Sequence, residues 1–203
     1  RWRCIIGTME DPFNTFYYIL QLHRKHPQAA LLFFALVADY GAFDKNISHH
    51  NEEFRQLLKH LADHSKVGLH TSYASHKQTN LIGEELSRLR DIIHHDIDSN
   101  RAHFLLQSLP YSYRELQRHD IKHDYTMGYA EVSGFRAGIS VPYPFYDLSR
   151  DDEQPITVHP FCLMDVTLKR KHSLTNGEAL QTYKNMIDKV SALNGTCSCI
   201  FHN

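Results

Sequence analysis

Five short apolar runs in this chain contain, or end in, side chains that can take part in catalysis. The clearest is Val67-Gly68-Leu69-His70, where apolar or small residues lead to one imidazole and hydroxyl residues follow. A buried strand that ends in a polar loop has this pattern. The other four runs cover residues 101–106, 123–128, 134–138 and 199–203. We expect these strand ends to converge around His70 and to form one site.

The first of these side chains suit acid–base or metal chemistry. His70 can be a metal ligand, a general base or a buried structural imidazole. Arg101 and His103 are two residues apart, so on a strand their side chains would share a face. An arginine that points into a site can orient a carboxylate or bind an anionic intermediate. The alternative for this pair is a surface arginine beside a core histidine.

Four further polar residues follow or end apolar runs. Asp124 is either a site carboxylate or a loop residue that caps backbone N–H groups. Arg136 has a glycine two residues away on either side, which lets backbone approach closely, or it is an ordinary loop arginine. Asp165 is more typical of a solvated carboxylate. His202 is a candidate general acid or base, or a frayed residue at the chain end.

The sequence contains neither a GxSxG nor an HExxH motif. A serine–histidine–aspartate triad could be assembled from Ser72 and His202, but no spacing requires it. Cys197 and Cys199 are separated by one residue, which is not the CxxC spacing of a zinc knuckle or a redox loop. We predict that these cysteines are small core hydrophobes, with a redox or metal role as the alternative.

The elements that would position these residues alternate between short strands and amphipathic helices. The predicted strands cover residues 31–37, 67–70, 103–106, 121–125, 161–164 and 196–201, with a further short one near Phe135. The predicted helices begin near Asp11, Asn51, Thr79, Ser112 and a capping box at 175–178. Residues 142–160, with four prolines, indicate a surface excursion. This alternation predicts an α/β fold, a distorted or incomplete (β/α) barrel with about seven parallel strands, whose site lies at the carboxyl ends of the strands.

Composition limits the classes of partner. The chain has 203 residues, enough for one domain, and a formal net charge of −1, which favours neither nucleic acid nor an anionic membrane surface. No apolar run approaches the roughly 20 residues of a membrane span. The opening Arg1-Trp2-Arg3 has no initiator methionine, so we expect a piece of a longer protein.

With these residues in view, the sequence resembles the polysaccharide deacetylase family, also called carbohydrate esterase family 4 or the NodB-homology domain, in a divergent bacterial branch. His70-Thr71 resembles the start of its metal motif, and Arg101-Ala102-His103 its arginine-bearing motif. Asp124-Tyr125-Thr126 and Ile200-Phe201-His202-Asn203 are similar to the last two motifs. The Gly-Phe-Arg-Ala-Gly run at 134–138 is typical of this branch.

The resemblance implies a hydrolase that removes acetyl groups from carbohydrate substrates with a divalent metal, zinc being expected. It assigns His70 and His103 as metal ligands and His202 as the general acid, held by an acid such as Asp124. Arg101 or Arg136 would orient the base.

Two departures from the family pattern matter. Ala74 occupies the place of the second metal histidine, and nothing before His70 matches the Thr-Phe-Asp-Asp motif that supplies the catalytic base. The first barrel strand would then lie upstream, and residues 1–203 would form the C-terminal part of one deacetylase-like domain. The alternative function is a non-catalytic carbohydrate-binding domain on the same barrel, with the aromatic run at 143–146 as a surface for sugar rings.

Overall fold

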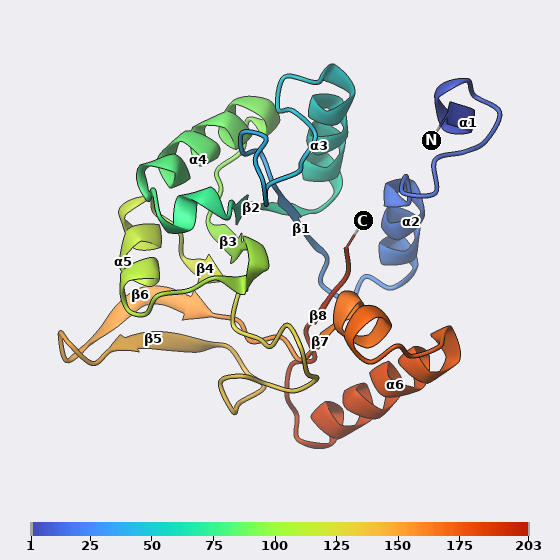
Figure 1. Cartoon of the computed structure of the whole chain (residues 1–203). Coiled ribbons are helices and arrows are strands. Elements are labelled where there is room, and N and C mark those ends of the chain that lie inside the picture. Colours follow the sequence, from blue (N-terminus) through green and yellow to red (C-terminus); the bar gives the residue numbers. More distant parts are fainter. Residues whose placement is uncertain (1, 203) are drawn as a thin grey trace.

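The computed structural model describes residues 2–202, which form two separate β-sheets with helices packed around them (Figure 1). The larger sheet has six strands in the order β1-β2-β3-β4-β6-β5. Its strands are β1 Leu32–Ala35, β2 Lys66–Thr71, β3 Ser99–Ala102, β4 His123–Asp124, β5 Tyr143–Asp147 and β6 Asp152–Val158. The smaller sheet pairs β7 Leu163–Met164 with β8 Cys199–Ile200.

The parallel α/β prediction is confirmed in its main feature. Strands β1, β2, β3, β4 and β6 are parallel neighbours, and only β5 runs antiparallel, against β6. The prediction of one barrel with about seven parallel strands is not confirmed, because five strands of the larger sheet and two of the smaller sheet pair in parallel and β5 is antiparallel. Closure of a barrel is not seen within residues 2–202 and stays a prediction.

Three amphipathic helices cover one side of the larger sheet, and their buried side chains form an apolar core with it. They are α3 Glu52–His64, α4 Asn80–Ile93 and α5 Tyr111–Arg118, which lie beside one another in Figure 1. Leu61, Leu89 and Tyr113, one from each helix, are buried in the same cluster as Leu69 of β2. This burial fixes the sheet, because about 25 cal/mol is gained for each Å² of apolar surface removed from water.

The proline-rich stretch at 142–160 is a β-hairpin that completes the sheet, so the predicted surface excursion is wrong. Pro144 lies on β5, the edge strand, where a missing N–H is tolerated. Pro155 lies on β6, where the pairing jumps from Thr157–Pro144 to Gln154–Phe145. The irregularity leaves Pro155 outside the ladder, which is how an internal strand accommodates proline.

The smaller sheet packs against helix α6, Asn176–Ala192. The predicted capping box begins this helix, with Thr175 accepting from the Glu178 amide and Glu178 accepting from the Thr175 amide. Tyr183 and Met186 of α6 pack against Leu163 of β7. The strands predicted at 161–164 and 196–201 correspond to β7 and β8, which are shorter and pair only with each other.

The remaining helices are short or peripheral. Helix α1 covers Trp2–Ile5 and α2 covers Phe16–Lys25, and the single turns η1 Ala74–His76, η2 His103–Leu105 and η3 Thr167–Lys171 follow strands or connect them. Helix α2 begins after Thr15 instead of at Asp11, whose carboxylate accepts from the Phe13 amide in a separate turn. The predicted strand near Phe135 is a turn region. Among residues 2–202, every helix is too short or too polar to cross a bilayer.

Candidate active site

The centre of the site is a pair of cross-strand neighbours. His70 of β2 lies opposite Arg101 of β3 in the parallel ladder. The His70 Nδ1 atom donates to the Arg101 carbonyl oxygen at 2.5 Å, and an Arg101 Nη2 hydrogen points at His70 Nε2 at 3.3 Å. Because a carbonyl can only accept, His70 carries its proton on Nδ1 and keeps its lone pair on Nε2.

Burial keeps His70 neutral. Its residue is only 9% exposed, and burial lowers the pKa of the imidazole well below its usual value, with a further lowering by the Arg101 charge. A neutral imidazole with a lone pair on Nε2 is the form that binds metals or accepts protons.

Arg101 is a buried cation without a bound carboxylate among the described residues. It is 8% exposed, its Nε–H has no hydrogen-bond partner, and its guanidinium lies 5.9 Å from the centre of the Phe34 ring. Burial lowers the pKa of Arg101 to about 10, and the charge of Asp165 opposes this. A buried charge with an unused donor is costly, so its geometry suits a site that receives an anion.

His103 enters the site from a turn, not from a strand. The predicted strand at 103–106 is wrong, because β3 ends at Ala102 and residues 103–105 form the turn η2. In this turn the His103 Nδ1 atom donates to Asp44 Oδ1 at 2.8 Å, and the His103 ring lies 5.0 Å from the His70 ring. The turn thus brings together the two imidazoles predicted as metal ligands.

Asp44 is a site residue that the sequence analysis missed. It is 3% exposed and accepts from the amides of Tyr73 and Ala74 as well as from His103. It therefore ties the turn after His70 to the turn after Arg101. Asp44 lies in an irregular segment after β1, where no strand pattern marks a site position.

His202 is held by Asp165, not by Asp124 as predicted. The His202 Nδ1 atom donates to Asp165 Oδ1 at 2.6 Å, and the His202 amide donates to Oδ2 at 2.9 Å. Burial alone would raise the pKa of Asp165. The hydrogen bonds from His202 and the charge of His202 have a larger, opposite effect, so the pKa of Asp165 is lowered. The pair follows β7 and β8, and Asn203 of the predicted motif lies outside the described residues.

The His202–Asp165 pair is electrostatically coupled to the central pair. The charge of His202 contributes to lowering the pKa of His70, and the charge of Asp165 acts on Arg101. This coupling relates the His202–Asp165 pair to three of the five predicted runs, those that contain His70, Arg101 and His202.

Asp124 is saturated by neutral donors and faces the core. Its residue is 1% exposed, and its oxygens accept from side chains or amides of Asn100, Gln107, Tyr113 and Thr126 at 2.8–3.3 Å. Burial raises the pKa of this carboxyl. The environment favours a structural carboxylate that fixes the segment after β4.

Arg136 stays outside the site. It is exposed in the turn region between Gly134 and Gly138, where its charge acts on Tyr143. The glycines have positive φ angles of 131° and 74°, so they serve the turns themselves. The prediction that Arg136 orients the base has no support in its position.

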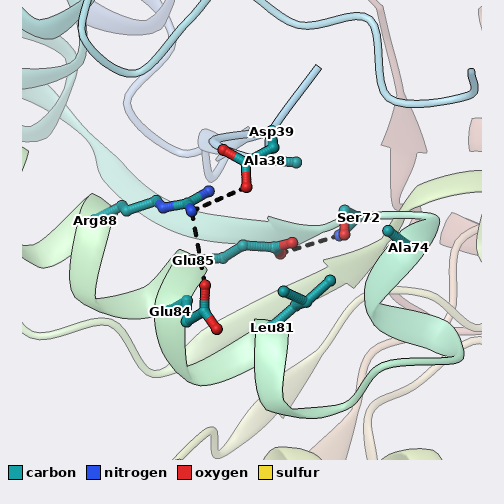
Figure 2. Close-up of a pocket in the computed structure, with 8 residues that line it drawn as sticks. All are labelled: Ala38, Asp39, Ser72, Ala74, Leu81, Glu84, Glu85 and Arg88. Carbon is teal, nitrogen blue, oxygen red and sulfur yellow. Dashed lines mark hydrogen bonds and ion pairs between the residues drawn. The ribbon is translucent and has the colours of Figure 1, made fainter. Parts of the chain in front are cut away.

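A small cavity is lined in part by Ser72 and Ala74, in the segment that follows His70 (Figure 2). Its volume of about 40 Å³ suits water and not a sugar. Eight residues line it: Ala38, Asp39, Ser72, Ala74, Leu81, Glu84, Glu85 and Arg88. Glu85 is 2% exposed and accepts from the Ser72 amide at 3.1 Å, and burial raises the pKa of Glu85 to about 7. Its place on the apolar stripe of α4, between Ile82 and Leu89, was the sequence signal for this buried acid.

Three aromatic rings stand beside His103. Phe43 and Tyr73 stack with ring centres 4.2 Å apart, and Phe104 meets both edge-on at 5.9 and 5.5 Å. Phe43 and Phe104 are more than half exposed. Phe104 has a φ of 56°, a strained conformation for a non-glycine residue, and such strain concentrates at functional sites. We call Phe43, Tyr73 and Phe104 the aromatic platform.

The predicted metal site is partly matched by the residues present. His70 and His103 both use Nδ1 to donate to an oxygen, which leaves both Nε2 atoms as possible ligands, as is usual for metal-binding histidines. However, no group of three ligating residues that includes either histidine occurs within residues 2–202. The described residues therefore supply two imidazoles and not a complete ligand set.

Comparison with known proteins relates the fold to one group of solved structures. A protein from Mycobacterium smegmatis, proposed to be a polysaccharide deacetylase, superposes with a TM-score of 0.63 at 11% identity, over 90% of this chain and 61% of that one. A protein from Bordetella bronchiseptica, also proposed to be a polysaccharide deacetylase and involved in O-antigen biosynthesis, aligns at a TM-score of 0.43 and 14% identity, over 76% and 54% of the two chains. The chain has the fold of the mycobacterial protein.

Sequence comparison adds nothing to this assignment. No family model matches the chain, and no curated protein does either. The chain spans about three fifths of the length of the mycobacterial protein. The likeness at 11% identity concerns the fold, so the chemistry depends on the site itself.

Proposed function

We propose that this chain carries the proton-transfer half of a carbohydrate deacetylase that hydrolyses the acetamido group of N-acetylated sugars with the aid of a divalent metal. The observation that carries the proposal is the His202–Asp165 pair beside Arg101, a buried guanidinium without a carboxylate partner among the described residues. Amide hydrolysis needs both parts, because the departing amine requires a proton and the reacting carbonyl develops negative charge.

In this proposal the His202 imidazole is the acid. Asp165 accepts from Nδ1 and so fixes the ring orientation, which leaves Nε2 to deliver a proton to the amine nitrogen as the C–N bond breaks. The Arg101 guanidinium stabilises the oxyanion and then the acetate product, with the two parallel N–H groups that suit a carboxylate.

His70 and His103 would hold the metal, for which zinc is the first candidate, together with further ligands. A divalent ion in such a site polarises a carbonyl and lowers the pKa of bound water. The carbohydrate would lie on the aromatic platform, because sugar rings present apolar faces that stack on aromatic rings. Its position next to His103 places a bound ring at the edge of the site.

The experiment is acetate release from N-acetylated oligosaccharides by the full-length protein, with two matched variants. Asp165→Asn leaves His202 without its carboxylate and is expected to lower kcat by about 10²–10⁴-fold with little loss of stability. Asp124→Asn places an amide against several donors and is expected to lower the free energy of unfolding by about 1–3 kcal/mol. Equal kcat values for Asp165→Asn and the parent would contradict the assignment.

Removal of metal is the second arm of this experiment. Dialysis against a chelator is expected to abolish acetate release, and added Zn²⁺ to restore it. The alternative, a non-catalytic sugar-binding domain, is favoured by the incomplete ligand set within residues 2–202. Oligosaccharide binding without acetate release under any metal condition would support that alternative.

Substitution in the aromatic platform tests the substrate class. Phe104→Ala is expected to raise KM about fivefold, because stacking on one ring contributes roughly 1 kcal/mol, while kcat changes little. Phe13→Ala is the control, since Phe13 is 70% exposed on a distant segment and should change neither constant. An unchanged KM in Phe104→Ala would remove the platform from the substrate site.

A further inference from the structure

The smaller sheet contains three cysteines that the proposed reaction does not use. Cys162 directly precedes β7, Cys199 lies on β8, and Cys197 precedes β8 by two residues. All three are free thiols, and their sulfur atoms lie within 4.8 Å of one another. We call them the thiol cluster. The sequence analysis predicted core hydrophobes, and the cysteines are indeed buried or half-buried, but they face each other.

The distances within the thiol cluster match those of a metal-thiolate site. Cys162 and Cys197 have sulfur atoms 3.7 Å apart, and Cys197 and Cys199 have theirs 3.9 Å apart. A tetrahedral zinc ion with Zn–S bonds of about 2.3 Å separates its sulfur ligands by roughly 3.8 Å. An ion could therefore enter without a large movement of the backbone.

The three thiols shift one another's pKa values, which reflects their close contact. Hydrogen bonding by Cys199 lowers the pKa of the Cys162 thiol to about 7, against the effect of burial, while the same contact raises the pKa of Cys199. Burial raises the pKa of Cys197 to about 11. Zinc binds cysteine as the thiolate, so an ion in the cluster would release the protons of its thiol ligands.

A polar group nearby has no partner in the described structure. The Tyr183 hydroxyl is buried without a hydrogen bond, and Tyr183 packs in the same apolar cluster as the three cysteines. The charges of all three thiol groups contribute to raising the pKa of this phenol, which indicates their closeness. Metal-bound thiolates would give this donor a strong acceptor.

We propose that Cys162, Cys197 and Cys199 bind one zinc ion as a structural site, separate from the deacetylase centre. The ion would join the beginnings of β7 and β8, whose other ends carry Asp165 and His202. These strands pair over only two residues each, so a covalent-strength link at their start would fix the acid–base pair that follows them.

Cobalt(II) titration of the reduced full-length protein tests the site. We expect sulfur-to-cobalt charge-transfer absorption that saturates at one equivalent, shows the visible bands of tetrahedral cobalt, and disappears when Zn²⁺ is added. The bands should be lost in Cys162→Ser and in Cys199→Ser, and kept in Cys4→Ser. They should also persist in His70→Ala, which separates this site from the deacetylase centre and keeps a failure of one proposal distinct from a failure of the other.

Thiol alkylation followed by mass spectrometry needs no variant and covers the case in which a substitution prevents folding. Zn²⁺ should protect Cys162, Cys197 and Cys199 from the reagent in the folded parent protein, while Cys4, on α1, stays reactive as an internal control. Absence of sulfur-to-cobalt bands in the folded parent, or equal alkylation of all four cysteines with and without zinc, would overturn the proposal.

Discussion

At the scale of single residues, the site is organised by imidazoles that share one arrangement. His70, His103 and His202 each use Nδ1 to donate to an oxygen atom, which belongs to a carbonyl in the first case and to a carboxylate in the other two. The Nε2 atoms of His103 and His202 are therefore left for chemistry, whereas that of His70 faces the Arg101 guanidinium. Arg101 differs from them, because it is a buried cation with a free donor.

The sequence identified most of these residues but not their partners. His70 and His202 end or follow apolar runs, and Arg101 and His103 lie in the run at 101–106, which is a local signal. Asp44 was not identified, because its position depends on contacts between segments that are far apart in the chain. For the same reason Asp124 was predicted to hold His202, although Asp165 does so. Glu85 was also missed, although its place on the apolar stripe of α4 is a local signal.

Arg101→Met should separate activity from stability. Replacing a buried charge by an apolar side chain of similar length is often neutral or stabilising by about 1–4 kcal/mol, since the desolvation cost disappears. We therefore expect acetate release to be lost while the free energy of unfolding, measured in urea, stays equal or rises. Arg101→Lys keeps the charge but loses the planar donor pair, and should also be inactive. A variant Arg101→Met that is several kcal/mol less stable would mean that Arg101 is structural.

At the scale of elements, helix signals were more reliable than strand boundaries. The capping box at Thr175 and the apolar stripe of α4 are local patterns, and both helices begin within one residue of the predicted place. Strand β3 begins at Ser99, four residues before the predicted strand. Its limits are set by pairing with β2 and β4 and not by the hydrophobicity of its residues. The β5–β6 hairpin was missed because the irregular pairing beside Pro155 is a property of two strands together.

Strand β2 depends on a glycine between its neighbours. A Cβ atom at Gly68 would lie 2.7 Å from the Phe34 ring of β1 and 2.8 Å from the Ser99 carbonyl oxygen of β3. Gly68→Ala must therefore push β2 away from β3 and is expected to lower the free energy of unfolding by about 1–3 kcal/mol. Gly41→Ala is the control, because its nearest atom would be 4.0 Å away. Equal melting temperatures for the two variants would contradict the close packing of these strands.

At the scale of the whole molecule, one large apolar core and two smaller apolar clusters position the residues of the site. The larger core joins the six-stranded sheet to its helices, and smaller clusters surround β7, β8 and α6. The fold class was predictable, because alternating strands and helices imply parallel pairing. The division into two sheets was not, since the strands at 161–164 and 196–201 look like any other buried strands in the sequence.

The buried acid Glu85 should make global stability depend on pH. Its pKa of about 7 in the folded protein exceeds its ordinary value of 4.5, so the folded state binds this proton more tightly than the unfolded chain does. The free energy of unfolding should therefore fall as pH rises from about 4.5 to about 7. In Glu85→Gln the amide oxygen can still accept from the Ser72 amide, but the side chain no longer titrates. The variant should therefore lack up to about 3 kcal/mol of the decrease in unfolding free energy that the parent shows over this pH range.

The measurement for Glu85 is urea unfolding of the parent and of Glu85→Gln at a series of pH values. The stability difference between the two proteins should grow in favour of the variant as pH rises, and then level off above pH 8. A difference that is independent of pH would show that Glu85 is ionised throughout. Glu84→Gln, on the exposed side of the same turn, is the matched control.

The pairing of His70 with Arg101 across β2 and β3 also has an evolutionary consequence. A single inserted or deleted residue within 66–71 or 99–102 would turn one of these side chains to the opposite face of the sheet. Lineages that keep the site should therefore accumulate length changes in the connections around these strands but never inside them. Ungapped blocks at these two places, even among relatives whose other residues have diverged beyond recognition, would be the historical trace of this geometry.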